Sequence, residues 1–179
     1  MTQYSARRTP KHLGPAAWSA ILPGQSAPVV LEQVISVDVA IVGAGFAGLS
    51  AAKRVRQLVP GASVAVLEAS RISEGASGRN SGFMIDLPHD LTSDDYAGHG
   101  DDRAMIGLNR YAIGFAHEVV AEYGIDKNFF DPVGKINGAA SEKADALNAS
   151  YAAHLTALGE PNERLDAQAM YEVTGSRHY

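Results

Sequence analysis

The hydrophobic positions of the chain first follow the pattern of a strand, a helix and a second strand. Residues 37–42 are apolar except for one aspartate, which is typical of a strand covered on both faces. Residues 47–58 carry apolar side chains three or four positions apart and predict a helix that ends before Pro60. Residues 63–67 predict a second strand that closes at Glu68. This order predicts a βαβ unit.

Two longer helices are predicted further along the chain. Residues 102–123 repeat apolar side chains at helical spacing, and Gly124 fits a C-cap. Residues 141–158 predict another helix, and residues 129–139 between the two are expected to be extended, with a turn. A stripe of aromatic side chains on the first of these helices is interpreted as core packing: Tyr111, Phe115 and Tyr123.

Composition narrows the functional classes. The 179 residues have a formal net charge of −5, which provides no basic surface for nucleic acid. The chain contains zero cysteines, which excludes disulfides, thiol nucleophiles, cysteine-ligated zinc and thioether-linked cofactors within it. No apolar run reaches the roughly 20 residues of a membrane span, and no secretory signal is recognisable at the start of the sequence. A cytoplasmic protein without nucleic-acid or membrane partners is expected.

Three glycines separate the first predicted strand from its helix in the pattern Gly43-x-Gly45-x-x-Gly48. The first permits a sharp turn, the second lets a pyrophosphate approach the backbone, and the third allows the helix to pack closely on the strand. The helix N-terminus then faces the diphosphate. Glu68, at the end of the second strand, can accept hydrogen bonds from a ribose. The pattern predicts dinucleotide binding, with FAD and NAD both open.

A second glycine-rich loop makes the prediction more specific. The sequences VDVAIVGAGFAGLSAA, residues 37–52, and GASGRNSGFM, residues 75–84, resemble the FAD-dependent amine and amino-acid oxidoreductases of the D-amino-acid oxidase superfamily. The similarity is strongest to the branch that contains glycine and sarcosine oxidases and gamma-glutamylputrescine oxidoreductase. Residues 130–136 are also similar in shape to the entry into that family's substrate domain.

The resemblance implies that the second loop runs beneath a flavin. Ser77 and Arg79 would lie near the diphosphate and ribityl chain, and Asn80, Ser81 and Gly82 near the isoalloxazine ring. An alternative for Arg79 is a clamp on a substrate carboxylate. The predicted cofactor-binding residues are Gly43, Gly45, Phe46, Ala47, Gly48, Glu68, Ala69, Ser77, Gly78, Arg79, Asn80, Ser81, Gly82, Phe83 and Met84.

No catalytic residue and no metal ligand is assigned. No histidine lies in a motif that matches the family, and cysteine is missing, so non-covalent FAD is expected. His89 and His99 flank an acidic run that extends to Asp101 and Asp102. Its spacing places no two ligands on one face of a regular element, and a solvated acidic loop is expected there instead of a metal site.

The expected fold is α/β, with a Rossmann-type FAD-binding domain and the beginning of a second, substrate-binding α+β domain. Residues 1–36 are broken by prolines and glycines and predict an irregular arm anchored by Trp18 on the main body. Residues 37–126 would form the N-terminal part of the FAD-binding domain, and residues 127–179 the start of the substrate domain. A two-stranded parallel sheet leaves faces and edges open, so another chain or segment is expected to complete the fold.

The resemblance implies an FAD-dependent oxidoreductase that removes a hydride from the carbon next to an amine. The substrate would be an amino acid or another primary or secondary amine, and the imine product would hydrolyse. Reduced flavin would be reoxidised by oxygen or another acceptor. Three alternatives stay open: an NAD-dependent dehydrogenase, a flavin enzyme acting on a non-amine substrate, and a non-catalytic FAD-holding subunit or fragment.

Overall fold

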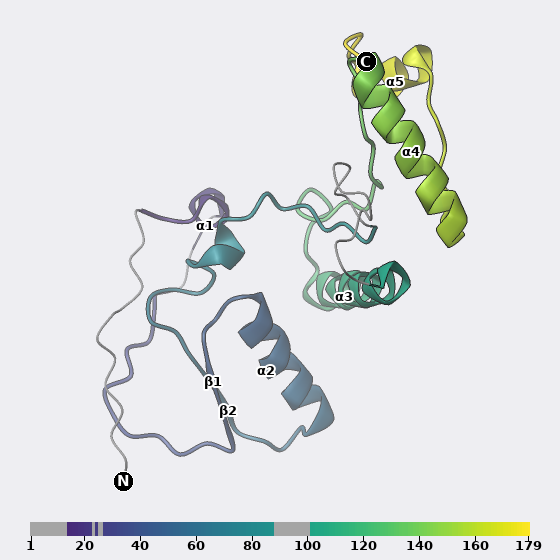
Figure 1. The fold of residues 1–179 in the computed structure, drawn as a ribbon. Coiled ribbons are helices and arrows are strands. Elements are labelled where there is room, and N and C mark those ends of the chain that lie inside the picture. Colours follow the sequence, from purple (N-terminus) through teal and green to yellow (C-terminus); the bar gives the residue numbers. More distant parts are fainter. Residues whose placement is uncertain (1–13, 23, 25–26, 88–100) are drawn as a thin grey trace. The chain divides into compact units, whose positions relative to one another are not determined.

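The chain forms two compact units, residues Met1–Phe83 and Met84–Tyr179 (Figure 1). A computed structural model describes residues 14–22, 24, 27–87 and 101–179. The predicted domain boundary at residue 126 falls inside the second unit. Each unit is considered by itself below.

The first unit contains the predicted βαβ unit. Strand β1 (Val39–Val42) leads into helix α2 (Phe46–Leu58), which leads into strand β2 (Val64–Leu67). The two strands pair in parallel, from Val39 opposite Val64 to Val42 opposite Leu67, and α2 packs against both (Figure 1). The predicted element types are confirmed, with bounds that differ by two residues or fewer.

Burial along β1 alternates instead of being complete. Val39 and Ile41 are half-buried, whereas Ala40 and Val42 are exposed, and Val42 is 87% exposed. Among the described residues, α2 covers one face of this strand and nothing covers the other. The described residues cover one of the two faces as predicted, and the cover of the second face stays a prediction.

The start of the sheet is held by a reciprocal set of hydrogen bonds between Asp38 and Ser63. The Ser63 N–H and hydroxyl donate to Asp38 Oδ2 over 2.8 and 2.7 Å, and the Asp38 N–H donates to Ser63 Oγ over 2.9 Å. The backbone N–H of Val39 also donates to Ser63 O over 3.1 Å. These bonds fix the register at the point where both strands begin.

The described residues of the second unit form three helices: α3 (Asp102–Tyr123), α4 (Glu142–Leu158) and α5 (Ala167–Thr174). At the start of each helix, the side chain of the N-cap residue accepts at least one backbone N–H, and each helix ends at a glycine with a left-handed conformation. The N-caps and C-caps are Asp101 and Gly124 for α3, Ser141 and Gly159 for α4, and Asp166 and Gly175 for α5. The first two helices were predicted almost to the residue. The third was not predicted.

Other expectations for this unit are met in part or lie outside the described residues. Residues 129–139 contain no strand, but the predicted turn is present, with Val133 N–H bonded to Asp131 O. The prediction that the aromatic stripe of α3 is core is wrong for two of its three residues, since Tyr111 and Tyr123 are 65% and 66% exposed, whereas Phe115 is half-buried. The predicted acidic loop lies outside the described residues as far as residue 100.

A small core and several polar contacts connect the elements of the second unit. Tyr151 and Leu155 of α4 are both 5% exposed, and Leu87 packs against them. Arg103 Nη1 of α3 donates to Leu158 O over 2.7 Å, at the end of α4. His154 Nε2 lies 2.6 Å from Asp102 Oδ2.

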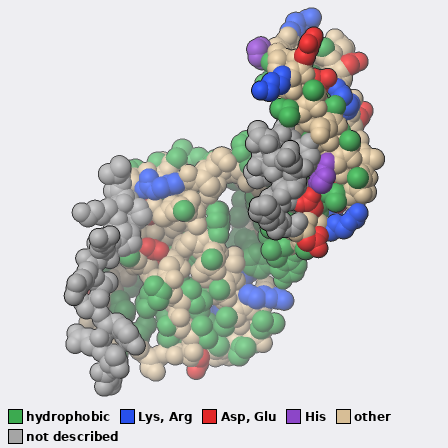
Figure 2. Space-filling model, viewed as in Figure 1, with side chains coloured by type: hydrophobic (Ala, Val, Ile, Leu, Met, Phe, Trp, Pro, Cys, Tyr) green, Lys and Arg blue, Asp and Glu red, His purple; other side chains and the backbone are tan. Residues whose placement is uncertain are grey.

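No helix in the described parts of the chain combines the length and the apolar character that crossing a membrane requires. Many apolar side chains are nevertheless visible on the surface of the unit that holds α2 and the sheet (Figure 2). The most exposed of those described include Val29, Val30, Val34, Val42 and Phe83.

Candidate cofactor site

The site is built on the turn between β1 and α2. Gly43 has φ +103°, a conformation that residues with a Cβ rarely adopt, and its N–H donates to Leu67 O over 2.7 Å. A Cβ on Gly48 would collide with Gly43 O and would come within 3.3 Å of Ile41 Cγ2. The first and third glycines therefore do in this structure what the motif predicts: they permit the turn and bring the helix close to the strand.

The second glycine-rich loop meets the first at the start of α2. Ser77 Oγ accepts the N–H of Phe46 over 3.0 Å, and Gly45 itself supplies no side-chain cap. A Cβ on Gly45 would lie 2.7 Å from Ser77 Oγ. Residues 31 positions apart in the sequence are thus brought together at a helix N-terminus, the kind of position that favours an anion.

Glu68 lies beside the same turn. Its Oε2 accepts the Ala44 N–H over 2.8 Å, and its Oε1 accepts the Ser70 N–H over 3.1 Å. These bonds orient the carboxylate at the end of β2, and each carboxylate oxygen has more than one lone pair. The geometry is compatible with the predicted hydrogen bonds to a ribose.

Arg79 makes contacts that the sequence did not predict. Its Nε donates to Glu74 O over 3.0 Å and its Nη2 donates to Gly14 O over 2.6 Å. Nη2 also lies 3.6 Å from Glu74 Oε2. The guanidinium thus binds its own loop and the N-terminal segment. Sequence analysis missed Glu74, although an acidic residue five positions before an arginine in a short loop was a usable signal.

Most of the remaining predicted residues belong to the second glycine-rich loop. Asn80 holds its shape, since Nδ2 donates to Ser77 O over 2.6 Å and Oδ1 accepts the Gly82 N–H over 2.7 Å. Gly78 is buried, whereas the other residues of this group are exposed: Ala47, Ala69, Asn80, Ser81, Gly82, Phe83 and Met84. Trp18 Nε1 donates to Asn80 O over 2.8 Å, which confirms that the arm is anchored through Trp18.

These features fit the diphosphate and ribose of FAD. The first turn of a helix has N–H groups without intrahelical partners, and in α2 the N–H of Phe46 donates to Ser77 Oγ. A carboxylate for the ribose lies at the neighbouring strand end. The role of each residue toward FAD stays a prediction.

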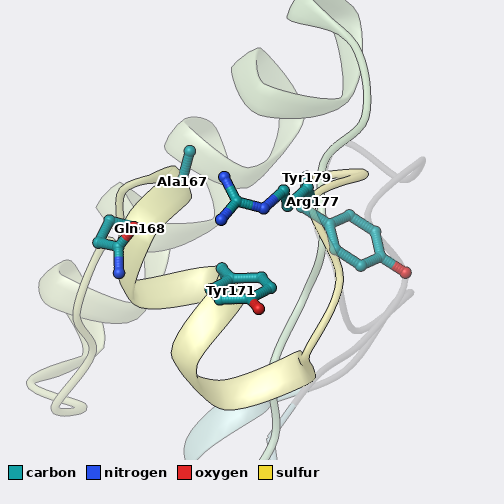
Figure 3. Close-up of a pocket in the computed structure, with 5 residues that line it drawn as sticks. All are labelled: Ala167, Gln168, Tyr171, Arg177 and Tyr179. Carbon is teal, nitrogen blue, oxygen red and sulfur yellow. The ribbon is translucent and has the colours of Figure 1, made fainter.

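The second unit has a cavity of its own, of about 370 Å³. It is lined by Ala167, Gln168, Tyr171, Arg177 and Tyr179, and the Arg177 guanidinium extends toward α5 (Figure 3). Arg177 stacks on the Tyr171 ring, 4.6 Å from its centroid. No predicted cofactor residue lines this cavity, and its walls contain no cluster of acid and base groups.

The described residues include no group of three or more His, Asp or Glu side chains placed to hold a metal ion. His154 and Asp102 form a pair without a third ligand of this kind. His117 packs edge-on against Phe130, with ring centroids 4.8 Å apart.

Comparisons with known proteins agree with the cofactor that the site fits. The sequence model of the family described as FAD dependent oxidoreductase (DAO) matches residues 38–178. Gamma-glutamylputrescine oxidoreductase of Escherichia coli (strain K12) is 36% identical over 101 residues, which cover 55% of this chain and 23% of that protein.

Two further relatives are named probable oxidoreductase OrdL. The Rhizobium meliloti (strain 1021) protein is 28% identical over 184 residues, which cover 96% of this chain and 40% of that protein. The Haemophilus influenzae (strain ATCC 51907 / DSM 11121 / KW20 / Rd) protein is 34% identical over 97 residues, which cover 53% of this chain and 22% of that protein. The chain thus spans at most 40% of the length of these relatives. No solved structure matches it significantly.

Proposed function

Because the chain belongs to the FAD dependent oxidoreductase family, we propose that it forms the cofactor-binding part of an enzyme that oxidises an amine or amino acid. The carbon next to the amine loses a hydride, and the resulting imine is hydrolysed by water. The electrons pass finally to oxygen or another acceptor. The observation that carries the cofactor assignment is the meeting of Ser77 with Gly45 and Phe46 at the start of α2.

Bound FAD would supply the hydride acceptor, and this chain would supply binding and orientation. The N–H groups at the start of α2 would donate to the diphosphate, with Ser77 Oγ beside them. Glu68 would accept hydrogen bonds from the adenosine ribose. The backbone of residues 80–84 would lie along the flavin ring, and FAD would be held without a covalent bond.

The proposal that the substrate is an amine rests on less evidence than the proposal that the cofactor is FAD. Gamma-glutamylputrescine, named in one relative, carries an amine, and that relative aligns with 55% of this chain. The family itself establishes an FAD-dependent oxidoreductase. Anaerobic mixing of the full-length enzyme with a panel of primary and secondary amines and amino acids should bleach the flavin absorption for at least one of them. Bleaching only by alcohols or 2-hydroxy acids would contradict the proposed substrate class.

A substitution of Gly45, the second glycine of the motif, tests the proposed cofactor site. Gly45→Val places a branched side chain against Ser77 Oγ, at the point where the diphosphate must approach, so FAD occupancy should fall at least tenfold. Occupancy is measured from the visible absorption of the purified protein. Gly61→Val is the matched control, because a Cβ at Gly61 meets no atom within 4 Å. A folded Gly45→Val protein with full FAD occupancy would refute the site.

We also propose that a further polypeptide segment completes the fold around the flavin. One face of β1 is open among the described residues, and α3 exposes part of its apolar stripe. A substrate must be aligned with the flavin ring in a pocket that excludes water. The residues that would form that pocket are not assigned in this chain.

A further inference from the structure

We propose that residues 14–22, the clamp, hold residues 74–82, the flavin loop, in the shape that binds FAD. Glu74, Arg79 and Trp18 are then positioning residues that act through the loop and not on the cofactor directly. The clamp contains helix α1 (Ala17–Ile21), which packs on the short 3-10 turn η1 (Ala76–Gly78) of the flavin loop. The inference rests on the cofactor site proposed above.

The first connection passes through the Glu74 carboxylate. Glu74 is only 7% exposed, and its Oε2 accepts the Ala16 N–H over 2.8 Å. A carboxylate at this depth is costly unless it is hydrogen-bonded and paired with a cation. Arg79 Nη2, 3.6 Å away, supplies the cation. The charge buried in the flavin loop is therefore satisfied in part by the backbone of the clamp.

The second connection is the Arg79 guanidinium. Two of its N–H groups point to carbonyl oxygens of different segments, Glu74 O in the loop and Gly14 O in the clamp. The planar guanidinium holds its donors in a fixed arrangement, which a lysine ammonium group does not reproduce. Through these two hydrogen bonds, Arg79 connects the flavin loop to the clamp.

The third connection is Trp18. Its indole N–H donates to Asn80 O over 2.8 Å, and a Cβ on Gly82 would lie 2.6 Å from its Cζ2 atom. A Cβ on Gly78 would likewise lie 2.8 Å from Ala16 Cβ. Two glycines of the flavin loop are thus needed for close approach of the clamp, in addition to any role toward a flavin.

The flavin loop depends on such contacts because it has little regular structure of its own. Apart from η1 it contains no helix or strand. The clamp fixes the loop on both sides of Ser77, the residue that reaches the start of α2. A loop that is already ordered loses less conformational entropy when its ligand binds. The clamp should therefore raise FAD affinity without touching FAD.

The test is a double-mutant cycle in the full-length protein, with Trp18→Phe, Arg79→Gln and the double variant. The dissociation constant of FAD is measured by titrating apoprotein. Each single variant should weaken FAD binding by about threefold to tenfold, the effect of losing one or two hydrogen bonds. The double variant should bind more tightly than the product of the two effects predicts, because both changes act through the same clamp.

Two readouts separate positioning from general destabilisation. The visible absorption bands of bound flavin should shift in Trp18→Phe, and limited proteolysis of the apoprotein should cut the clamp or the loop faster in each variant. Arg79→Lys should weaken binding as much as Arg79→Gln, since it keeps the charge but not the two-way contact. Arg56→Gln, which removes a charge in the last turn of α2, is the matched control and should behave as wild type.

Several results would contradict the proposed role of the clamp. In one, Trp18→Phe leaves the affinity and the spectrum unchanged. In another, the single effects multiply fully in the double variant. Retained affinity in Arg79→Lys would assign Arg79 to the diphosphate instead. Failure of the underlying site is distinguishable, because it would appear as full FAD occupancy in Gly45→Val whatever the Trp18 variants do.

Discussion

Asp38 and Ser63 show how single residues set the geometry of the site from a distance. Their reciprocal hydrogen bonds fix the pairing of β1 and β2 at one end of the strands. The glycine turn and Glu68 lie at the other end, where Val42 is opposite Leu67. Because the register is constant along the pair, the bonds at the start also determine that Glu68 ends beside Ala44, whose N–H it accepts.

This pair predicts a defined pH dependence. The hydroxyl and the backbone N–H of Ser63 hold the pKa of the Asp38 carboxyl below its ordinary value of 3.8. The charged form is favoured in the folded state, so the stabilisation is present above pH 3.8 and is lost as the pH falls through the lowered pKa. Ser63→Ala should raise the Asp38 pKa toward 3.8, measured by NMR titration of the carboxyl carbon.

A second variant separates the titration from other effects of the substitution. Asp38→Asn lacks the titrating group but keeps an acceptor, so its stability should no longer change with pH through the Asp38 transition. An Asp38 pKa that is the same in Ser63→Ala as in the unsubstituted protein would show that the Ser63 hydroxyl does not lower it.

At the scale of elements, the contact between α2 and β1 decides whether the glycine turn between them can form. Gly48→Ala would push its Cβ into the Gly43 carbonyl and toward Ile41, so the helix must move away from the strand. Overpacking of this kind costs about 1–3 kcal/mol. We expect a lower midpoint of thermal unfolding and weaker FAD binding.

Gly107→Ala provides the comparison for that substitution. Gly107 lies inside α3, and a Cβ there meets no atom within 4 Å. Replacing an interior helical glycine by alanine should stabilise the second unit by about 0.5–1 kcal/mol. Equal effects of the two substitutions on thermal unfolding would contradict the close contact between α2 and β1.

Local sequence patterns were sufficient to predict the longer elements but not their surroundings. The bounds of α3 were predictable because apolar spacing and the terminal glycine agree, and Gly124 adopts φ +60° as its position requires. Helix α5 was missed, since it is eight residues long and offers barely two turns of pattern. The open face of β1 could not be predicted, because period and composition do not identify what packs on a strand.

The local geometry of the candidate cofactor site was predictable to a similar degree. Its glycine turn and Glu68 follow from a motif whose spacing has a physical reason. The Arg79 contact to Gly14 spans 65 positions, and no pattern in either segment pairs them. Long-range contacts of loops are therefore the part of this site that sequence alone did not reveal.

At the scale of the whole molecule, the described residues leave much apolar surface uncovered. On α3, the side chains of Met105, Leu108 and Tyr111 are exposed. In the first unit, the side chain of Val42, just before the glycine turn, is exposed as well. Large exposed apolar patches mark sites of interaction. The chain also spans at most 40% of the length of its curated relatives. Both observations favour a larger fold in which further segments cover these surfaces.

The last prediction follows from that uncovered surface. Residues 1–179 expressed alone should bind the dye ANS, which reports exposed apolar surface, and should hold FAD more weakly than the full-length protein. Val42→Thr keeps a β-branched side chain but reduces the apolar area on the open face of β1. It should lower ANS binding to the 179-residue chain and should destabilise the full-length protein, where we expect Val42 to be covered. A monomer of residues 1–179 that binds no ANS, retains FAD and turns over an amine would show instead that this chain needs no further segment.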